Sequence, residues 1–229
     1  MTHENKLARL AGLLYLIVVV FGVFRLIYVP SQIMVHDDMH ATINHIVGSS
    51  FLLRAGIASA LVEQVMFLFL SFALFCLLHP VGKNIAVVMV TLVAVNVAIT
   101  LVAEVYPLDV LALLTHAHHG QVLAPEQLEL LVRQSFNSYD DALLIAELFW
   151  GLWLLPFGYL VLKSGFLPKI LGIFLMLGGL SYFVEVFGSI LFAHYSETAI
   201  SNYVTLPAAI GEIGTCLWLL LVGVRQRHA

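Results

Sequence analysis

Two glutamates occur in nearly identical apolar surroundings at distant points of the chain. Aligned on Glu147 and Glu212, the two segments share the pattern E-x-x-x-x-L-W-L-L-x-x-G, which ends at Gly158 and Gly223. A looser version of the pattern follows Glu63. A carboxylate within an apolar run can bind a cation, exchange a proton or form hydrogen bonds, and each role requires a partner because an isolated buried charge is costly. The matched spacing predicts three carboxylates at a comparable depth.

Two further charged residues reach the same level from the opposite direction. The apolar segments that begin at Arg9 and at Lys169 align with each other, and the alignment places Arg25 opposite Glu185. In each segment the helical rise from the basic residue to the aligned charge is about 24 Å. We therefore expect Arg25 and Glu185 in the same half of the structure as the three repeated glutamates.

These residues form a predicted polar layer, together with two more charged residues at helix ends. Its members are Arg25, Arg54, Glu63, Glu104, Glu147, Glu185 and Glu212. A single charge at the middle of a bilayer costs roughly 2.5–3.5 kcal/mol, so the layer is expected to face itself, a water-filled cavity or a bound ligand. The alternative is purely architectural, because polar residues such as an Arg25–Glu185 pair also join membrane helices through hydrogen bonds.

The first predicted outer loop contains a cluster of candidate metal ligands. It reads HDDMHATINH, with His36, His40 and His45 as the histidines, and residues four apart share one face of a helix. A divalent metal is therefore a candidate cofactor, although the pattern H-E-x-x-H is absent. The stretch THAHHG at 115–120 adds three histidines without a diagnostic spacing. The alternative interpretation is that these histidines are solvated surface residues.

The composition places these candidate residues in a membrane protein. The chain is 61% hydrophobic and only 10% charged, whereas soluble domains are about 25% charged. Runs of roughly 20 apolar residues are typical of bilayer-spanning helices, and they occur at 10–29, 54–78, 85–106, 143–162, 170–193 and 207–224. We expect an all-α polytopic membrane protein, a six-transmembrane-helix bundle that forms a single integral membrane domain over 1–229. No segment is typical of nucleic-acid binding.

The basic residues predict the orientation of this bundle. Seven of the ten lysines and arginines fall at one set of predicted helix ends: Lys6, Arg9, Lys83, Lys163, Lys169, Arg225 and Arg227. The excess of positive charge marks cytoplasmic ends, so both termini are expected in the cytoplasm. The connections at 30–53, 107–142 and 194–206 then face outward, and the largest is predicted to carry a short amphipathic surface helix in APEQLELLVRQS.

Several stretches resemble a bacterial membrane family known as domain of unknown function 4386. The most specific is L-P-x-G-x-L-V-x-x-S-G-F-L-P-x-x-L-G at 155–172, and the resemblance extends to Asp38, Thr42 and Asn44 followed by Arg54. It also includes the stretches ARLAGLLYLI and DDMHATINHIVGSSFLLRAGI. The resemblance implies a six-helix protein of the bacterial inner membrane. It implies no activity.

Three classes of function follow from these features. The favoured one is a membrane protein that binds or translocates a cation, an amine or another small polar ligand through the acidic layer. The second is an integral membrane enzyme, with or without a metal, that acts on a lipid-like substrate. The third is an accessory protein whose buried charges serve assembly only. The lipid bilayer is the expected partner in each case, and the sequence predicts neither the ligand nor the oligomeric state.

Overall fold

The computed structural model describes residues 3–36, 38–118 and 124–224, and every regular element in these ranges is helical. The prediction of an all-α chain is therefore confirmed. The elements in order are α1 (His3–Val23), η1 (Phe24–Tyr28), α2 (Val29–Ile33), α3 (Met39–Gly48), α4 (Ser50–Ala103), α5 (Val105–His118), α6 (Pro125–Ser164), α7 (Lys169–Leu191), η2 (Tyr195–Glu197), α8 (Ala199–Tyr203), α9 (Leu206–Leu217) and η3 (Trp218–Val222).

Within the described ranges, five helices are long and apolar enough to cross a membrane. They cover His3–Ile33, Ser50–Thr115, Pro125–Ser164, Lys169–Leu191 and Ala199–Val222. The predicted helices at 54–78 and 85–106 belong to one of these elements, so the count differs from the expected six. The reason is that the connection between them is a sharp turn in which Gly82 alone leaves helical geometry.

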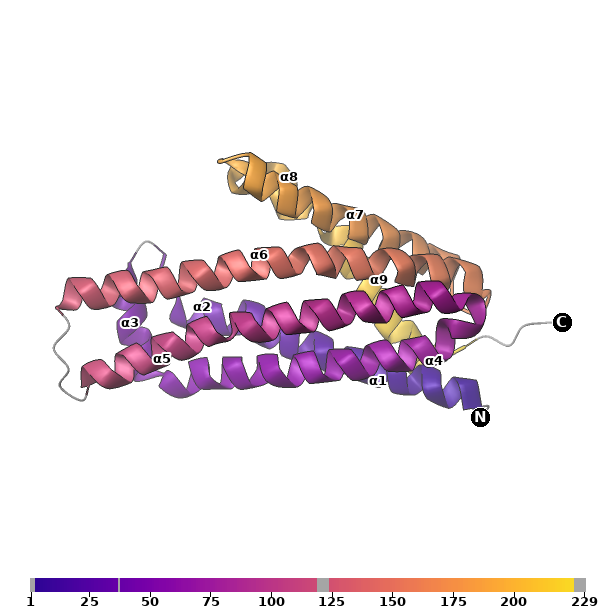
Figure 1. Ribbon diagram of the computed structural model, residues 1–229, viewed down its shortest axis with the longest axis horizontal. Helices are drawn as coiled ribbons and strands as arrows, with labels where there is room; N and C mark the ends of the chain where they lie inside the picture. The colour runs from indigo at the N-terminus through magenta and orange to yellow at the C-terminus, as the bar shows by residue number, and fades with distance from the viewer. Residues whose placement is uncertain (1–2, 37, 119–123, 225–229) are drawn as a thin grey trace.

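That turn lies at Gly82, where the backbone of α4 leaves helical geometry with φ −173° and ψ 88°. The apolar stretch Ser50–Thr115 has 66 residues. As a straight helix it would extend over about 100 Å, roughly three times the thickness of the hydrocarbon core. Figure 1 shows α4 folding back, so that its second arm and α5 run beside its first arm. The two arms are named here the first arm (50–81) and the second arm (83–103) of α4.

The helix α6 is a single element of 40 residues. The predicted surface helix at 124–135 is wrong as a separate element, because it forms the first turns of α6 and continues into the predicted span at 143–162. The intervening stretch 136–142 contains polar residues but neither glycine nor proline. Polar residues end an apolar run without ending a helix. The region 107–142, expected as a loop, is consequently helical over most of its described length.

The family-like block at 155–172 forms the turn between α6 and α7. Gly165 adopts a left-handed conformation with φ 72°, which favours glycine because it lacks a Cβ atom. The Ser164 hydroxyl donates to the Val161 carbonyl at 2.8 Å and accepts from the Leu167 amide at 3.3 Å. Hydrogen bonds between residues of the turn itself therefore stabilise it.

Beyond the turn, two glycines bring the backbones of α6 and α7 into contact. A Cβ atom added to Gly158 would lie 2.7 Å from the Gly172 carbonyl oxygen, and one added to Gly172 would lie 2.8 Å from that of Gly158. The pair Gly151 and Gly179 repeats this arrangement one heptad away, also at 2.8 Å. Small residues at such positions are typical of membrane helix pairs. Most of the residues that specify the family-like block therefore serve this helix hairpin.

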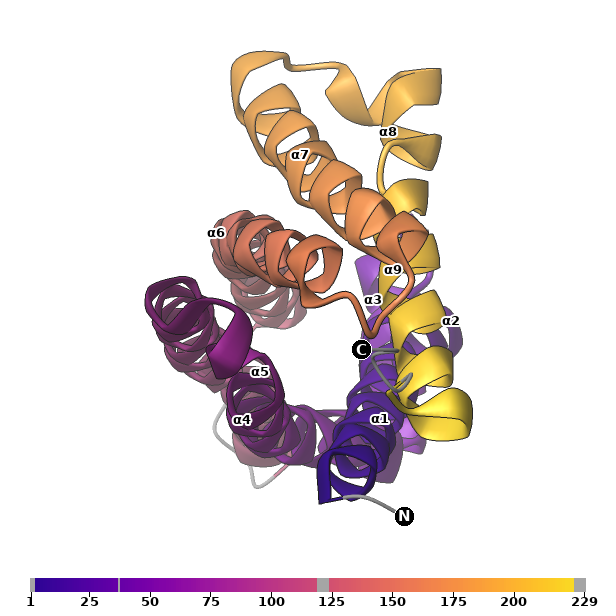
Figure 2. The same ribbon diagram turned by 90° about the vertical axis from the view of Figure 1, so that its right-hand side faces the viewer.

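The remaining helices complete a ring. Figure 2 shows α4, α6, α7, α9 and α1 following one another around the long axis. The last helix contacts both its neighbours through small residues: Gly211 lies against Leu175 of α7, and Leu219 of η3 lies against Gly12 of α1. The N-terminal and C-terminal helices are thereby held side by side.

Buried apolar side chains form two separate cores. The inner core lies among α1, α4, α6, α7 and α9 and contains Tyr15, Phe67, Leu70, Leu74, Met89, Trp153, Leu154 and Phe157. The outer core lies among α2, α3, the start of α4, α5 and the start of α6, and contains Val29, Ile33, Ile43, Ile46, Leu53, Ile57, Val110, Leu111 and Val132. Along the first arm of α4, Glu63 lies between the two cores.

The predicted inner connections share one end of the molecule. Figure 1 shows the N-terminus, the fold-back of α4 and the α6–α7 turn at the same end. Lys83, Lys163 and Lys169 belong to these connections by sequence. Arg225 and Arg227 lie outside the described residues. The predicted inner connections thus lie together, as the predicted orientation requires. The cytoplasmic location of this end stays a prediction.

Candidate functional site

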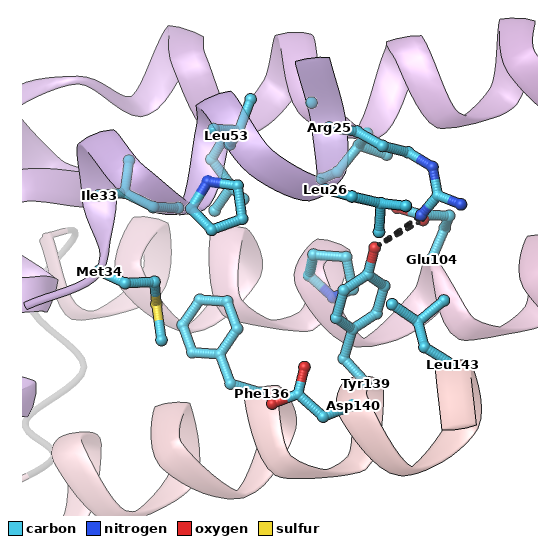
Figure 3. Close-up of a pocket in the computed structure, with 15 residues that line it drawn as sticks. Arg25, Leu26, Ile33, Met34, Leu53, Glu104, Phe136, Tyr139, Asp140 and Leu143 are labelled. Atoms are coloured by element: carbon cyan, nitrogen blue, oxygen red, sulfur yellow. Dashed lines mark hydrogen bonds and ion pairs between the residues drawn. The ribbon is translucent and has the colours of Figure 1, made fainter. Parts of the chain in front are cut away.

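The level between the two cores is occupied by a buried ionic network centred on Arg25. The Arg25 residue is 4% exposed, and its Nε donates to a carboxylate oxygen of Glu63. Its Nη1 donates to the Tyr139 hydroxyl at 3.1 Å and lies 3.5 Å from Oε1 of Glu104. The Tyr139 hydroxyl donates in turn to Glu104 Oε1 at 3.1 Å. Figure 3 shows three members of this group, Arg25, Tyr139 and Glu104.

Four segments bring these side chains together. Arg25 lies in η1, a π-helical turn, and such turns shift the direction of side chains relative to a regular α-helix. The first arm of α4 supplies Glu63, and Glu104 directly follows the second arm as its C-cap. Tyr139 comes from α6. Two carboxylates thus share one guanidinium, and the network carries an excess negative charge when both are ionised.

On the inner side of this network lies a cavity of about 360 Å³, named here the central cavity. Its polar lining residues are Tyr15, Glu63, Gln64, Asn96, Thr205 and Glu212, and its aromatic ones, besides Tyr15, are Phe67, Trp150, Trp153 and Tyr182. Members of the inner core therefore form its walls, and two of the predicted carboxylates face it.

The polar groups of the central cavity are only partly satisfied. Tyr15 donates a hydrogen bond of 3.0 Å to Glu212 Oε1. Gln64 Oε1 and Asn96 Nδ2 have no hydrogen-bond partner within the described part of the chain, although both residues are 1% exposed. A buried polar group without a partner costs about 1–3 kcal/mol. Water or a ligand in the cavity would supply the missing bonds.

The aromatic residues that line the central cavity, named here the aromatic wall, pack against one another and against their neighbours in stacked and edge-on pairs. Trp153 is 2% exposed, and its ring centre lies 5.1 Å from those of Phe67 and Phe157 and 6.3 Å from that of Tyr15. Trp150 meets Tyr182 edge-on at 6.1 Å. These spacings are those of favourable aromatic pairs. The wall is therefore a packed surface that holds its shape.

A second cavity of about 310 Å³, named here the outer cavity, lies on the other side of the network. Figure 3 shows Arg25 and Glu104 at one end of it and Met34 and Phe136 at the other. Leu26 lines both cavities. The Arg25–Glu63 ion pair consequently lies between two cavities, with Arg25 lining the outer one and Glu63 the central one.

Glu147 and Glu185 lie apart from these groups. They lie on α6 and α7, near enough to each other for electrostatic repulsion, and Glu185 Oε2 accepts a hydrogen bond of 3.1 Å from Tyr195. Neither lines the central cavity. The Arg25–Glu185 pair, considered above as an architectural alternative, is not formed, because Arg25 contacts Glu63 and Glu104 instead.

Arg54 also lies apart. It is exposed on the first arm of α4 and lines two other cavities, with Ile43 and with Phe51 respectively. Of the seven residues of the predicted polar layer, the structure joins Arg25, Glu63 and Glu104 directly, and it places Glu212 on the same cavity as Glu63.

The candidate metal ligands do not converge. His40 Nδ1 lies 3.1 Å from Glu129 Oε1 at the surface, and His36 and His45 are exposed. Across the ranges that the structure describes, no three His, Cys, Asp or Glu side chains group closely enough to hold a metal ion. His119 lies outside the described residues, and the side chains of His116 and His118 are likewise not described.

Sequence reasoning missed several residues of the site. Gln64 and Asn96 are polar residues within apolar runs, which is the signal that identified the glutamates and that applies to uncharged amides equally. Tyr139 lies in the stretch 107–142, which was predicted to be a connection between membrane helices. Tyr15 and Tyr182 carry no signal, since tyrosines are common in apolar helices.

One family model matches residues 10–223, and its description reads "Domain of unknown function (DUF4386)". The match confirms the resemblance stated from the sequence. No curated protein and no solved structure matches the chain.

Proposed function

Because the chain belongs to the family of the domain of unknown function DUF4386, its function has to be inferred from its own residues, and we propose that it binds a small polar or cationic ligand within a membrane. The binding site is the central cavity. One observation carries the proposal: Gln64 and Asn96, both almost fully buried, present unsatisfied amide groups to a cavity that two carboxylates also line.

The proposal includes six membrane crossings, with both arms of α4 counted separately. Measured from Gly82, the helical rise is about 28 Å to Glu63 and about 33 Å to Glu104. These distances are close to the thickness of the hydrocarbon core, about 30 Å. With the fold-back on the cytoplasmic side, the Arg25 network therefore lies near the outer boundary of the bilayer. In a bacterium this membrane is the inner membrane, and both termini lie in the cytoplasm.

The central cavity distinguishes this proposal from a purely architectural role. The Arg25 network, in which each carboxylate has a cationic neighbour, is what helix assembly alone would require. A cavity lined by amides that have no partner among the described residues is different, because unsatisfied amides destabilise a fold and have no use in assembly.

Thermal unfolding of the detergent-purified protein tests the proposal. We expect at least one compound from a panel of small amines, quaternary ammonium ions, amides, alcohols and carboxylates to raise Tm. Gln64→Leu should abolish this rise while Tm without compound stays equal or increases, because the unsatisfied amide is removed. Glu185→Gln, which changes a carboxylate away from the cavity, should keep the rise. The proposal fails if no compound raises Tm in the wild-type protein.

A further inference from the structure

Resting on the proposed function, we infer that the occupant of the central cavity is a small organic ammonium ion, either a protonated amine or a quaternary ammonium. Its cationic centre lies between Glu212 and the aromatic wall. The inference follows from the charge, the rings and the hydrogen-bonding groups of the cavity.

The charge of the lining excludes an anion. Among the described residues that line the central cavity there are two glutamates and no lysine, arginine or histidine. Glu63 binds Arg25, which it shares with Glu104. Glu212 has only the neutral Tyr15 hydroxyl as a hydrogen-bond donor. An ionised carboxylate that is taken out of water is stabilised by a cation, and the ligand supplies the positive charge that the lining lacks.

The aromatic wall favours an organic cation. Trp150, Trp153 and Tyr182 line the same space as Glu212, and an ammonium ion gains about 0.5–2 kcal/mol over an aromatic face. Clusters of aromatic rings beside a carboxylate are the usual means of binding quaternary ammonium groups.

A metal ion fits the cavity poorly. Calcium requires six to eight oxygen ligands and zinc three or four protein ligands. The described residues bring no three His, Cys, Asp or Glu side chains together, and indole rings do not ligate hard cations. A volume of about 360 Å³ is far larger than a bare ion needs and lies within the range of small organic ligands.

The two amides add a requirement for the ligand. Asn96 Oδ1 accepts from the Thr100 hydroxyl at 3.4 Å, which leaves Nδ2 as a donor without a partner. Gln64 Oε1 is an acceptor without a partner. A ligand hydroxyl accepts one hydrogen bond and donates another, which matches the donor on Asn96 and the acceptor on Gln64. The best fit is thus an ammonium ion that carries a hydroxyl group, as choline and protonated ethanolamine do.

Tryptophan fluorescence measures binding directly, because two of the three tryptophans border the cavity. In a Trp218→Phe background the remaining signal comes from Trp150 and Trp153. We expect choline, tetramethylammonium and ethanolamine to change this signal in a saturable manner. The neutral isostere of choline, 3,3-dimethylbutan-1-ol, should bind at least about tenfold more weakly.

Matched variants assign the binding to the cavity. Glu212→Gln keeps an oxygen for the Tyr15 hydroxyl and should weaken choline binding about tenfold or more, whereas Glu147→Gln, in the same sequence pattern, should leave it unchanged. Tyr182→Leu should weaken choline binding, and Phe183→Leu, its neighbour outside the lining, should not. Circular dichroism and Tm identify any variant that fails to fold.

The outcomes separate the two proposals. If the neutral isostere binds as tightly as choline, the ammonium inference is overturned and the polar-ligand proposal stands. If Mg²⁺ or Ca²⁺ binds and none of the ammonium ions does, the inference is overturned in favour of a metal. If neither the ammonium ions nor any compound of the thermal panel binds, both proposals fail. An equal loss of choline binding in Glu147→Gln and Glu212→Gln would also overturn the assignment to this cavity.

Discussion

Tyr15 donates a hydrogen bond of 3.0 Å to Glu212, a residue 197 positions further along the chain. The bond joins α1 to α9, so the first and the last long helices meet at the central cavity. It also gives Glu212, inside the bundle, its one direct hydrogen-bond donor among the described residues. The fold and the candidate site therefore depend on the same contact.

The first prediction concerns this contact. Tyr15→Phe removes the donor and leaves the Glu212 carboxylate without a partner, so the free energy of unfolding should fall by about 1–3 kcal/mol. Unfolding in mixed micelles with sodium dodecyl sulfate measures the change. Tyr159→Phe, at a tyrosine that is 40% exposed, serves as the control and should stay within about 0.5 kcal/mol of wild type. Equal effects of the two substitutions would contradict the prediction.

The second prediction concerns the Arg25 network. Arg25→Met leaves Glu63 and Glu104 buried without a cation and should lower the free energy of unfolding by about 3–5 kcal/mol. Arg54→Met, at an exposed arginine of the same half of the molecule, should have little effect.

A triple variant makes the prediction specific. Adding Glu63→Gln and Glu104→Gln to Arg25→Met removes all the charges and should restore most of the lost stability, since replacing a whole buried ionic group is far less costly than breaking it. The measurement is again unfolding in mixed micelles. A triple variant that is less stable than Arg25→Met would show that charge imbalance is not the cause.

The third prediction concerns the contact between α6 and α7. Gly158→Ala places a methyl group 2.7 Å from the Gly172 carbonyl oxygen, so the helices must separate and stability should fall by about 1–3 kcal/mol. Gly48→Ala is the matched control, because no atom lies within 4 Å of the added methyl group there. A Gly158→Ala protein with unchanged Tm would mean that the two helices are not in contact at this level.

The fourth prediction concerns orientation. In a background with both cysteines replaced, Cys76→Ala and Cys216→Ala, a single cysteine is introduced at Asn84 or at Gln127. A membrane-impermeant thiol reagent applied to intact cells should label Gln127→Cys and not Asn84→Cys. After permeabilisation both should react. The reverse pattern would invert the proposed topology.

Hydropathy predicted the apolar spans well but the ends of the helices poorly. The run at 143–162 is part of α6, which begins at Pro125. Hydropathy reports where a helix is buried in lipid, and α6 continues beyond that region with polar residues such as Asn137 and Asp140. Tyr139 was missed for this reason. A search for helix-breaking residues, instead of for polar ones, would have located the start of α6.

The repeat of Glu147 and Glu212 illustrates a second limit. Equal spacing along two helices predicts equal depth, but it does not predict the direction in which each side chain points. Glu212 lines the central cavity, whereas Glu147 does not and lies near Glu185 of α7. The direction depends on the rotation of each helix, which is set by contacts such as Gly151 against Gly179 and Gly211 against Leu175. Those contacts connect residues far apart in the chain, and one sequence alone does not reveal them.

The continuity of α6 has a mechanical consequence. Tyr139, which binds Arg25, and Trp153, which walls the central cavity, are two points on one rod of uninterrupted helix about 21 Å apart. The kink-prone Pro156 lies beyond Trp153 and not between them. We therefore expect a displacement of α6 at Trp153 to move Tyr139 as well, which would couple binding in the central cavity to the ion pairs of Arg25.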